Sequence, residues 1–112
     1  MQREIEGHPD YAITDYGEVI SSKRGEHSRV LIPDISNGYP RVTLDGERRY
    51  VADLVAEAFL IKPVGNRYKI FYIDGDKTNC DVHNLKYLTE SEIKICSQYS
   101  VEYRKQMLGE WV

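Results

Sequence analysis

The sequence predicts a single α+β domain in which antiparallel strands come first, a short helix follows, and a strand, a loop and a C-terminal helix complete the chain. Three observations carry this prediction. A turn-forming Asp-Gly pair lies between two strand-like segments within residues 41–50, apolar residues recur at helical spacing over residues 51–61, and a helix-capping signature begins at Thr89. A chain of 112 residues is long enough for one modest core.

The first part of the chain is predicted to form short strands separated by turns. Residues 11–14 and 18–21 flank the turn Asp15-Tyr16-Gly17. The polar run at 23–28 is expected to form a surface loop, and a short apolar segment follows at 30–32. This order indicates an antiparallel arrangement, because turns this short connect neighbouring strands of opposite direction.

A hairpin and a helix are the next predicted elements. Residues 41–44 and 47–50 flank Asp45-Gly46, a pair that accepts the positive φ angles of a type I′ turn. A helix is predicted over residues 51–61, with Pro63 as the residue that stops it. Its apolar stripe consists of Val51, Leu54, Val55, Ala58 and Phe59.

The last part of the chain is predicted to contain a strand, a loop and a helix. Residues 68–73 have a strand pattern, and residues 86–88 a brief extended one. Thr89 and Glu92 have the spacing of a capping box. The sequence therefore predicts one C-terminal helix from Ser91 to about Leu108.

Charge and composition restrict the partners that this chain can have. Fifteen basic and eighteen acidic residues give a formal net charge of −3, whereas DNA-binding domains usually carry a basic face. Such a face could be local, or the charges could simply be solvated; the residues concerned are Lys23, Arg24, Arg29, Arg41, Arg48 and Arg49. No apolar run approaches the ~20 residues that span a bilayer, and the start has no apolar signal region. With Cys80 and Cys96 expected to be reduced, we expect a cytoplasmic protein without membrane contact.

Residues 70–85, IFYIDGDKTNCDVHNL, form a motif that resembles the ββα-metal finger of HNH homing endonucleases. The turn at residues 73–79 and the Asn84-Leu85 pair stand where that family has them. Further blocks at 3–21, 38–44 and 51–59 are similar, in order and spacing, to the NUMOD-type module that precedes such fingers.

The resemblance implies a division of the chain and an origin. It places a NUMOD-like β module at 3–50, the helix at 51–61 and an HNH-like finger at 68–105. Because such enzymes are encoded by phages and introns, the resemblance also favours a phage-encoded protein acting in a bacterial host.

The resemblance implies that this chain has lost the catalytic groups of the family. In the family a histidine acts as general base, and one divalent ion stabilises the charge on the leaving oxygen. The histidine position is Tyr72 here, the metal-ligand positions are Phe71 and Ile93, and the structural asparagine is Asn84. A phenol with a reference pKa near ~10 is a poor base, and Phe and Ile have no oxygen to offer. We therefore expect no metal, no cofactor and no nuclease activity.

Other positions also depart from the family pattern. The His and Arg of the family's helix are Ala52 and Asp53 here, and this reverses a charge near the expected path of the DNA phosphates. The expected Trp is Tyr87, another aromatic residue. The residues expected to take part in binding are Asp53, Tyr72, Asp74, Asp76, Lys77, Arg41, Arg48 and Arg49.

Several residues allow a functional and a structural interpretation. His83 could be a relocated base, or a solvated loop histidine. The carboxylates Asp74, Asp76 and Asp81 could bind a metal, although Asp74-Gly75 is more simply a turn. Nine tyrosines could mark an interface or merely pack on a small sheet.

Three functions remain open on the sequence alone. The favoured one is a non-catalytic, HNH-derived protein that inhibits or modulates a protein partner, such as a host defence nuclease, in the manner of an anti-CRISPR protein. The second is a DNA-binding regulator without cleavage, which the arginines of the 41–50 hairpin favour. The third is an active nicking enzyme with a relocated base. The oligomeric state cannot be derived from these residues.

Overall fold

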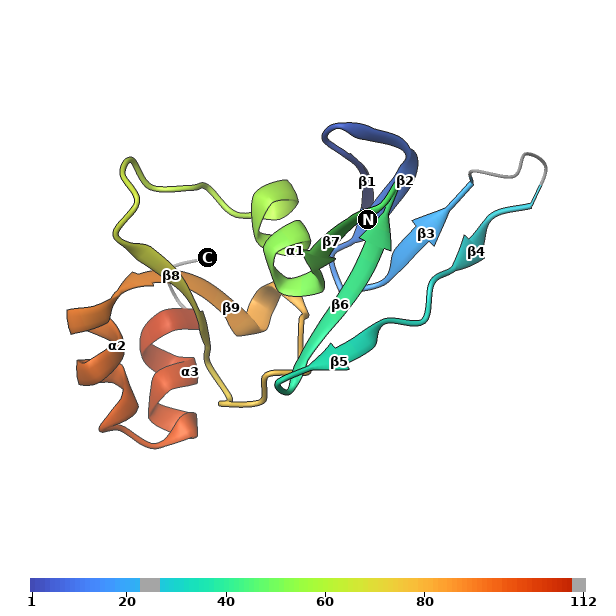
Figure 1. Ribbon diagram of the computed structural model, residues 1–112. Coiled ribbons are helices and arrows are strands. Elements are labelled where there is room, and N and C mark those ends of the chain that lie inside the picture. Colours follow the sequence, from blue (N-terminus) through green and yellow to red (C-terminus); the bar gives the residue numbers. More distant parts are fainter. Residues whose placement is uncertain (23–26, 110–112) are drawn as a thin grey trace.

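Turn residues divide the first fifty residues into short strands, which form two antiparallel sheets in the computed structural model (Figure 1). The structure describes residues 1–22 and 27–109. The first sheet has the order β1-β2-β3-β4 and the second the order β5-β6-β7. The strands are β1 Gln2–Ile5, β2 His8–Thr14, β3 Val19–Ser21, β4 Arg29–Val30, β5 Asp34–Ser36, β6 Tyr39–Leu44 and β7 Glu47–Tyr50. Together with the helices described below, they confirm the predicted α+β class.

The β2–β3 hairpin is confirmed, and two features of the first sheet differ from the prediction. Strand β1 pairs with β2 but was not expected, because only Ile5 of its four residues is buried and no alternating pattern marks it. The segment predicted at 30–32 extends only to Val30, within β4. Pro33 lies three residues after Val30 and has no N–H to continue a ladder.

The predicted hairpin at the Asp45-Gly46 pair is confirmed. Strands β6 and β7 pair from Leu44↔Glu47 to Arg41↔Tyr50. Both turn residues have positive φ angles, 51° at Asp45 and 85° at Gly46, as a type I′ turn requires.

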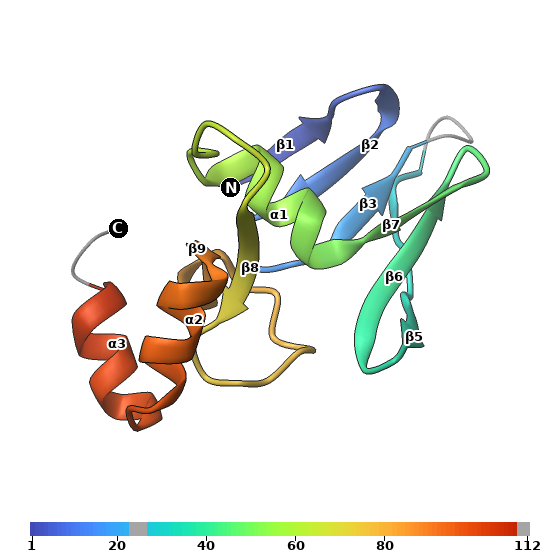
Figure 2. The same cartoon turned by 60° about the vertical axis from the view of Figure 1, so that its left-hand side comes forward.

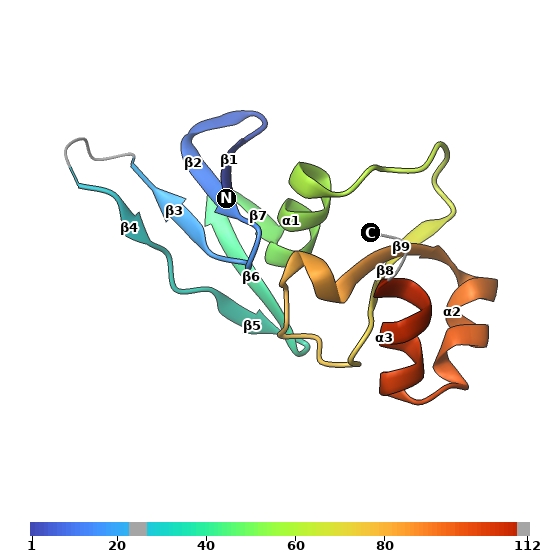
Figure 3. The ribbon, with the colours of Figure 1, turned by 180° about the vertical axis from the view of Figure 1, so that it is seen from behind.

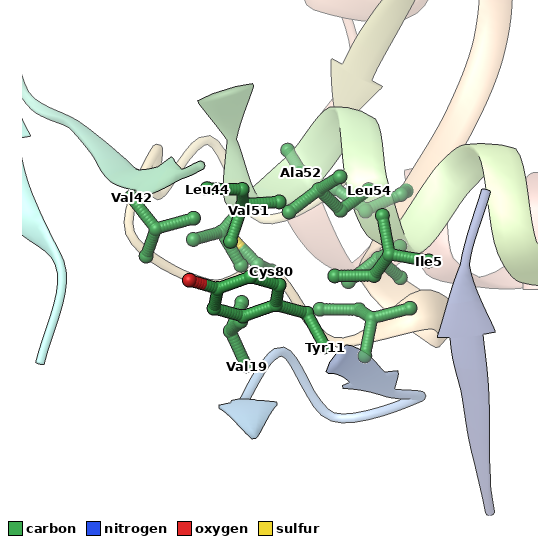
Figure 4. Packing of buried hydrophobic residues seen from close by; sticks show 12 residues of the cluster. Ile5, Tyr11, Val19, Val42, Leu44, Val51, Ala52, Leu54 and Cys80 are labelled. Carbon is green, nitrogen blue, oxygen red and sulfur yellow. The ribbon is translucent and has the colours of Figure 1, made fainter. Parts of the chain in front are cut away.

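Helix α1, Val51–Phe59, supplies the centre of the core (Figure 4). It ends two residues before the predicted limit, because Leu60 turns to an extended backbone conformation. Val51, Leu54 and Val55 are at most 2% exposed, so the predicted stripe does face the core. Buried residues of both N-terminal sheets surround it: Ile5, Tyr11, Ile13, Val19, Val42 and Leu44.

The predicted strand–loop–strand–helix order of the finger is also confirmed. Strand β8, Tyr68–Tyr72, pairs antiparallel with β9, Leu85–Thr89, and a single 3₁₀ turn, η1 Val82–Asn84, precedes β9. Helix α2, Glu90–Ser97, starts at a complete capping box: the Thr89 hydroxyl accepts from the Glu92 N–H, and the Glu92 carboxylate accepts from the Thr89 N–H.

The single C-terminal helix predicted over 91–108 is wrong. The structure has α2 and a second helix, α3 Val101–Gly109, which turns back beside α2 (Figures 1 and 2). The break is stabilised by the Ser100 hydroxyl, which accepts from the Tyr103 N–H and so begins α3. In one straight helix, Met107 would lie about 16 Å along the axis from Cys96. The turn instead lets both residues pack on the same apolar cluster.

The finger loop packs directly against the N-terminal sheet (Figure 3). Cys80 and Leu85 belong to the same buried cluster as the residues around α1. The Val82 N–H donates to the Asp15 carbonyl at 2.8 Å. Gly17, with a φ of 94°, approaches so closely that a Cβ there would lie 3.1 Å from the Cys80 Cβ.

Two sequence-based expectations remain, one about the proposed basic face and one about membranes. Lys23 and Arg24, proposed above as part of a basic face, lie outside the residues that the structure describes. Within the described ranges, no helix is long and apolar enough to cross a bilayer.

Candidate functional site at the finger and the adjoining groove

The two side chains at the family's base and first metal-ligand positions point to opposite sides of β8, because successive residues of a strand alternate. Phe71 is 7% exposed and packs with Ile73, Leu88 and Cys96. Ile93 packs against the same cluster from α2, and Met107 and Leu108 pack against it from α3. We call this set of residues the finger cluster.

The finger cluster therefore contains both residues that the motif comparison predicts at the family's metal-ligand positions. Neither Phe71 nor Ile93 carries an oxygen, and hard divalent cations require oxygen ligands. The residues at this point of the fold do not fit a divalent ion. Elsewhere in the described ranges, no group of three or more His, Cys, Asp or Glu side chains is arranged to hold a metal.

Arg104 of α3 holds the finger together at the edge of this cluster. Its guanidinium donates to the carbonyls of Cys96 at 3.0 Å, Ser97 at 3.2 Å and Ile73 at 3.3 Å. It also lies 5.6 Å from the centre of the Phe71 ring. One cation thus connects β8, α2 and α3, and no local sequence pattern indicates this role.

Tyr72, at the general-base position, faces away from the finger cluster and packs against the α1 side of the molecule. Its ring lies 5.9 Å from that of Tyr39. Burial raises the pKa of the Tyr72 hydroxyl above its ordinary value, with smaller contributions from Cys80, Tyr39 and Asp53. The phenol therefore stays protonated at neutral pH and cannot accept a proton from water.

Asn84 organises the finger loop, as expected from its position in the motif. Its side chain is buried, accepts from the Asp74 N–H at 2.9 Å, and donates to the Asp74 carboxylate at 2.9 Å and the Asn79 carbonyl at 3.0 Å. Burial alone would raise the pKa of Asp74, but hydrogen bonds from Asn79, the Asp76 N–H and Asn84 outweigh it and lower the pKa.

The other loop carboxylates are engaged in the same local way. One Asp76 oxygen accepts from the Thr78 N–H and hydroxyl, and one Asp81 oxygen accepts from the His83 N–H. Such bonds are those of Asx turns. They support the structural interpretation of these carboxylates.

His83 lies in the 3₁₀ turn η1 at the end of the finger loop. Its side chain is 76% exposed, and its Nδ1 lies 3.0 Å from the Asp81 carboxylate. It lines a shallow polar pocket of about 380 Å³ together with Asp74, Asn79 and Asn84. His83 thus lines a different pocket from Tyr72.

The hairpin arginines are not equivalent. Arg41 pairs with Asp34 at 2.8 Å, and Arg49 pairs with Glu57 at 2.6 Å and Glu47 at 3.4 Å. Arg48 is exposed and makes no ion pair within the described part of the chain. The Lys77 ammonium lies 4.9 Å from the centre of the Tyr39 ring.

Asp53 lies beside Tyr72 in a groove between α1 and the two hairpins. Burial raises the pKa of the Asp53 carboxyl, and the neighbouring Glu57 raises it further, while Arg49 and Lys62 act in the opposite direction. The structure therefore places Asp53 and Tyr72, two separately predicted binding residues, in the same groove. Tyr39, Tyr50 and Tyr68, which were not predicted as site residues, line it as well.

Comparisons with known proteins agree with this architecture. Residues 3–45 match the model of the NUMOD4 motif. A solved structure described as DNA binding and cleavage by the HNH homing endonuclease I-HmuI is 28% identical, with a TM-score of 0.70. The match covers 96% of this chain and 65% of that one. No curated protein matches significantly. Residues 3–45 therefore match a NUMOD4-type module, and the described fold as a whole is similar to that of an HNH homing endonuclease.

Proposed function

We propose that this chain is a non-cleaving HNH-type domain that binds DNA and acts as a regulator. One observation carries the absence of cleavage: Phe71 and Ile93, at the family's metal-ligand positions, are packed in the apolar finger cluster. A protonated tyrosine at the base position supports the same conclusion. The fold is kept, and the groups that perform hydrolysis are replaced.

The outer face of the β5–β7 sheet is the surface that suits DNA. Val42 and Leu44 are buried on the inner face, whereas Thr43 and Arg48 form an exposed cross-strand pair on the outer one. The major groove of DNA admits a two-stranded β-ribbon, and the β6–β7 hairpin that carries this pair is such a ribbon. The relative of known structure, I-HmuI, binds DNA, and this supports DNA as the partner here.

Restoring the family residues tests the loss of cleavage. The unaltered protein is expected to leave supercoiled plasmid intact with Mg²⁺ or Mn²⁺. The triple variant Phe71→Asp, Tyr72→His and Ile93→Asn is expected to gain weak, metal-dependent nicking, because it restores a base and two oxygen ligands. Gel analysis of plasmid topology measures both.

Two controls keep this test interpretable. Tyr72→His alone restores the base without ligands and should remain inactive, while thermal denaturation reports whether the triple variant folds. If the unaltered protein nicks plasmid, and Tyr72→Phe leaves that rate unchanged, a relocated base is present and the proposal is wrong. His83→Ala would then identify that base.

DNA binding is tested by its salt dependence. Affinity for a duplex oligonucleotide should fall steeply between 50 and 200 mM salt, because phosphate contacts release counterions. Arg48→Ala should weaken binding by about three- to tenfold and reduce the salt slope by about one. Arg67→Ala, in the exposed loop before β8, is the matched control. Equal losses for the two variants would remove the β5–β7 face from the proposal.

A second candidate function is inhibition or modulation of a protein partner. The net charge of −3, the pairing of Arg41 and Arg49 with carboxylates, and the carboxylate of Asp53 near the old site all favour a basic protein surface over a phosphate backbone. In this case the protein would act as an anti-CRISPR-like inhibitor of a nucleic-acid enzyme in the bacterial host. Absence of salt-dependent DNA binding would favour this candidate.

A further inference from the structure

Five of the nine tyrosines of the chain line a single groove of about 560 Å³. Its lining residues come mainly from α1, the β6–β7 hairpin and the β8–β9 hairpin. Figure 1 shows how these three elements are arranged. We call it the tyrosine groove; its aromatic residues are Tyr39, Tyr50, Tyr68, Tyr72 and Tyr87. Tyrosines of the NUMOD-like part thus face tyrosines of the finger across the end of α1.

The polar atoms of this groove are available to a ligand. None of the five hydroxyls makes a hydrogen bond to another described residue, and neither does the carboxylate of Asp53, which also lines the groove. Tyr72 and Tyr87 are half-buried, and burial raises the pKa of both hydroxyls, so these phenols remain neutral. Sheltered polar groups without partners are better satisfied by a bound group than by restricted water.

The ring faces already bind one cation within the molecule. The Lys77 ammonium lies over the Tyr39 ring at 4.9 Å. Tyr39 in turn contacts Tyr50 edge-to-face at 6.1 Å and Tyr72 at 5.9 Å. Electron-rich ring faces attract cations, and several rings around one space attract them more strongly.

The carboxylate at the base of the groove adds charge complementarity. Asp53 is half-buried, and both this burial and the nearby Glu57 raise the pKa of its carboxyl. A ligand cation beside Asp53 would relieve this cost, whereas a phosphate would increase it. Lys69, at the rim, donates to Glu90 outside the groove, which leaves Lys62 as the lining cation without an ion pair among the described residues.

We propose that the tyrosine groove binds an arginine side chain of a protein partner, with the guanidinium stacked on tyrosine rings and donating to Asp53. Arginine fits better than lysine, since its planar group stacks on aromatic rings and its five N–H donors match the carboxylate and the phenolic oxygens. Tyr39 and Tyr50 lie on the same side of β6 and β7 as Thr43 and Arg48, so this binding site adjoins the outer face of β5–β7. The oligonucleotide in the test below distinguishes an arginine ligand from a nucleic acid at these tyrosines.

The test titrates a blocked Gly-Arg-Gly tripeptide into the full chain and follows chemical shifts of the protein and of the arginine methylenes. A dissociation constant on the order of 1 mM is expected for a single side chain, with upfield methylene shifts from the tyrosine rings. The same peptide with citrulline, which has the shape of arginine without its charge, should bind at least tenfold more weakly, and the lysine peptide several-fold more weakly.

Variants locate the site. Asp53→Asn keeps the side-chain shape and should weaken arginine binding about tenfold, and Tyr50→Leu should weaken it at least threefold. Glu102→Gln, which removes an exposed carboxylate of α3, should leave it unchanged. Equal binding of the citrulline peptide, or an equal loss with Glu102→Gln, would overturn the proposal. So would a single-stranded oligonucleotide that shifts the same tyrosine signals and displaces the arginine peptide. Thermal denaturation confirms that each variant is folded.

Discussion

Replacing Arg104 with alanine is expected to lower the free energy of unfolding by about 3 kcal/mol, since the loss involves charge-assisted hydrogen bonds to several carbonyls. The guanidinium donates to three carbonyls at the ends of β8 and α2 and stacks on Phe71. Without it, the Ser97 and Ile73 carbonyls lose a charged donor, the Cys96 carbonyl keeps only backbone donors such as the Tyr99 N–H, and α3 loses its hydrogen bonds to β8 and α2. Thermal denaturation should show a midpoint lower by about 10 °C.

A conservative variant separates charge from geometry. Arg104→Lys keeps the positive charge but has a single ammonium that cannot reach three carbonyls at once, so most of the loss should remain. Lys94→Ala, on the exposed side of α2, is the matched control and should change stability by less than about 0.5 kcal/mol. Full retention of stability by Arg104→Lys would show that charge alone matters, contrary to the expectation.

Asn84→Ala is expected to destabilise the chain by about 3 kcal/mol, because it leaves buried hydrogen-bonding groups without partners. The amide of Asn84 joins the Asp74 N–H, the Asp74 carboxylate and the Asn79 carbonyl. Chemical denaturation monitored by circular dichroism measures the loss. His83→Ala, at the neighbouring exposed position, should have little effect on stability.

The isosteric variant Asn84→Asp gives this prediction a pH dependence. In the unaltered protein the pKa of Asp74 is lowered, so its carboxylate stabilises the fold above its unfolded pKa, and this stability is lost as the pH falls through the folded pKa. In the variant, a second carboxylate against Asp74 raises the shared pKa, so stability is lost as the pH rises. The gap between the two proteins should therefore narrow as the pH falls toward about 4. A gap independent of pH would contradict the proposed contact.

Local chemistry accounts for the features that the sequence predicted well. The Asp45-Gly46 turn requires two positive φ angles, and the capping box at Thr89 needs a hydroxyl and a carboxylate three residues apart. Both signals lie within a few residues and do not depend on the rest of the molecule. The placement of Phe71 and Tyr72 on opposite sides of β8 likewise follows from strand alternation.

Features made by distant contacts could not be predicted in the same way. The break between α2 and α3 arises because Arg104 and the finger cluster favour a turn that no Pro or Gly marks. The neutralisation of Arg49 depends on Glu57, which reaches it from the next element. The tyrosine groove joins side chains of two hairpins that are neighbours only because α1 packs between them.

The contact between the β2–β3 hairpin and the finger loop limits how this fold can be divided when segments are exchanged between genes. Leu85 and Cys80 are buried among residues of the N-terminal sheets and α1, and Cys80 lies so close to Gly17 that a side chain at position 17 would have no space. A finger transferred alone to another protein would expose part of its own interior to water. An exchange between genes that preserves the fold must therefore carry the β2–β3 hairpin, α1 and the finger together, although family motifs divide them.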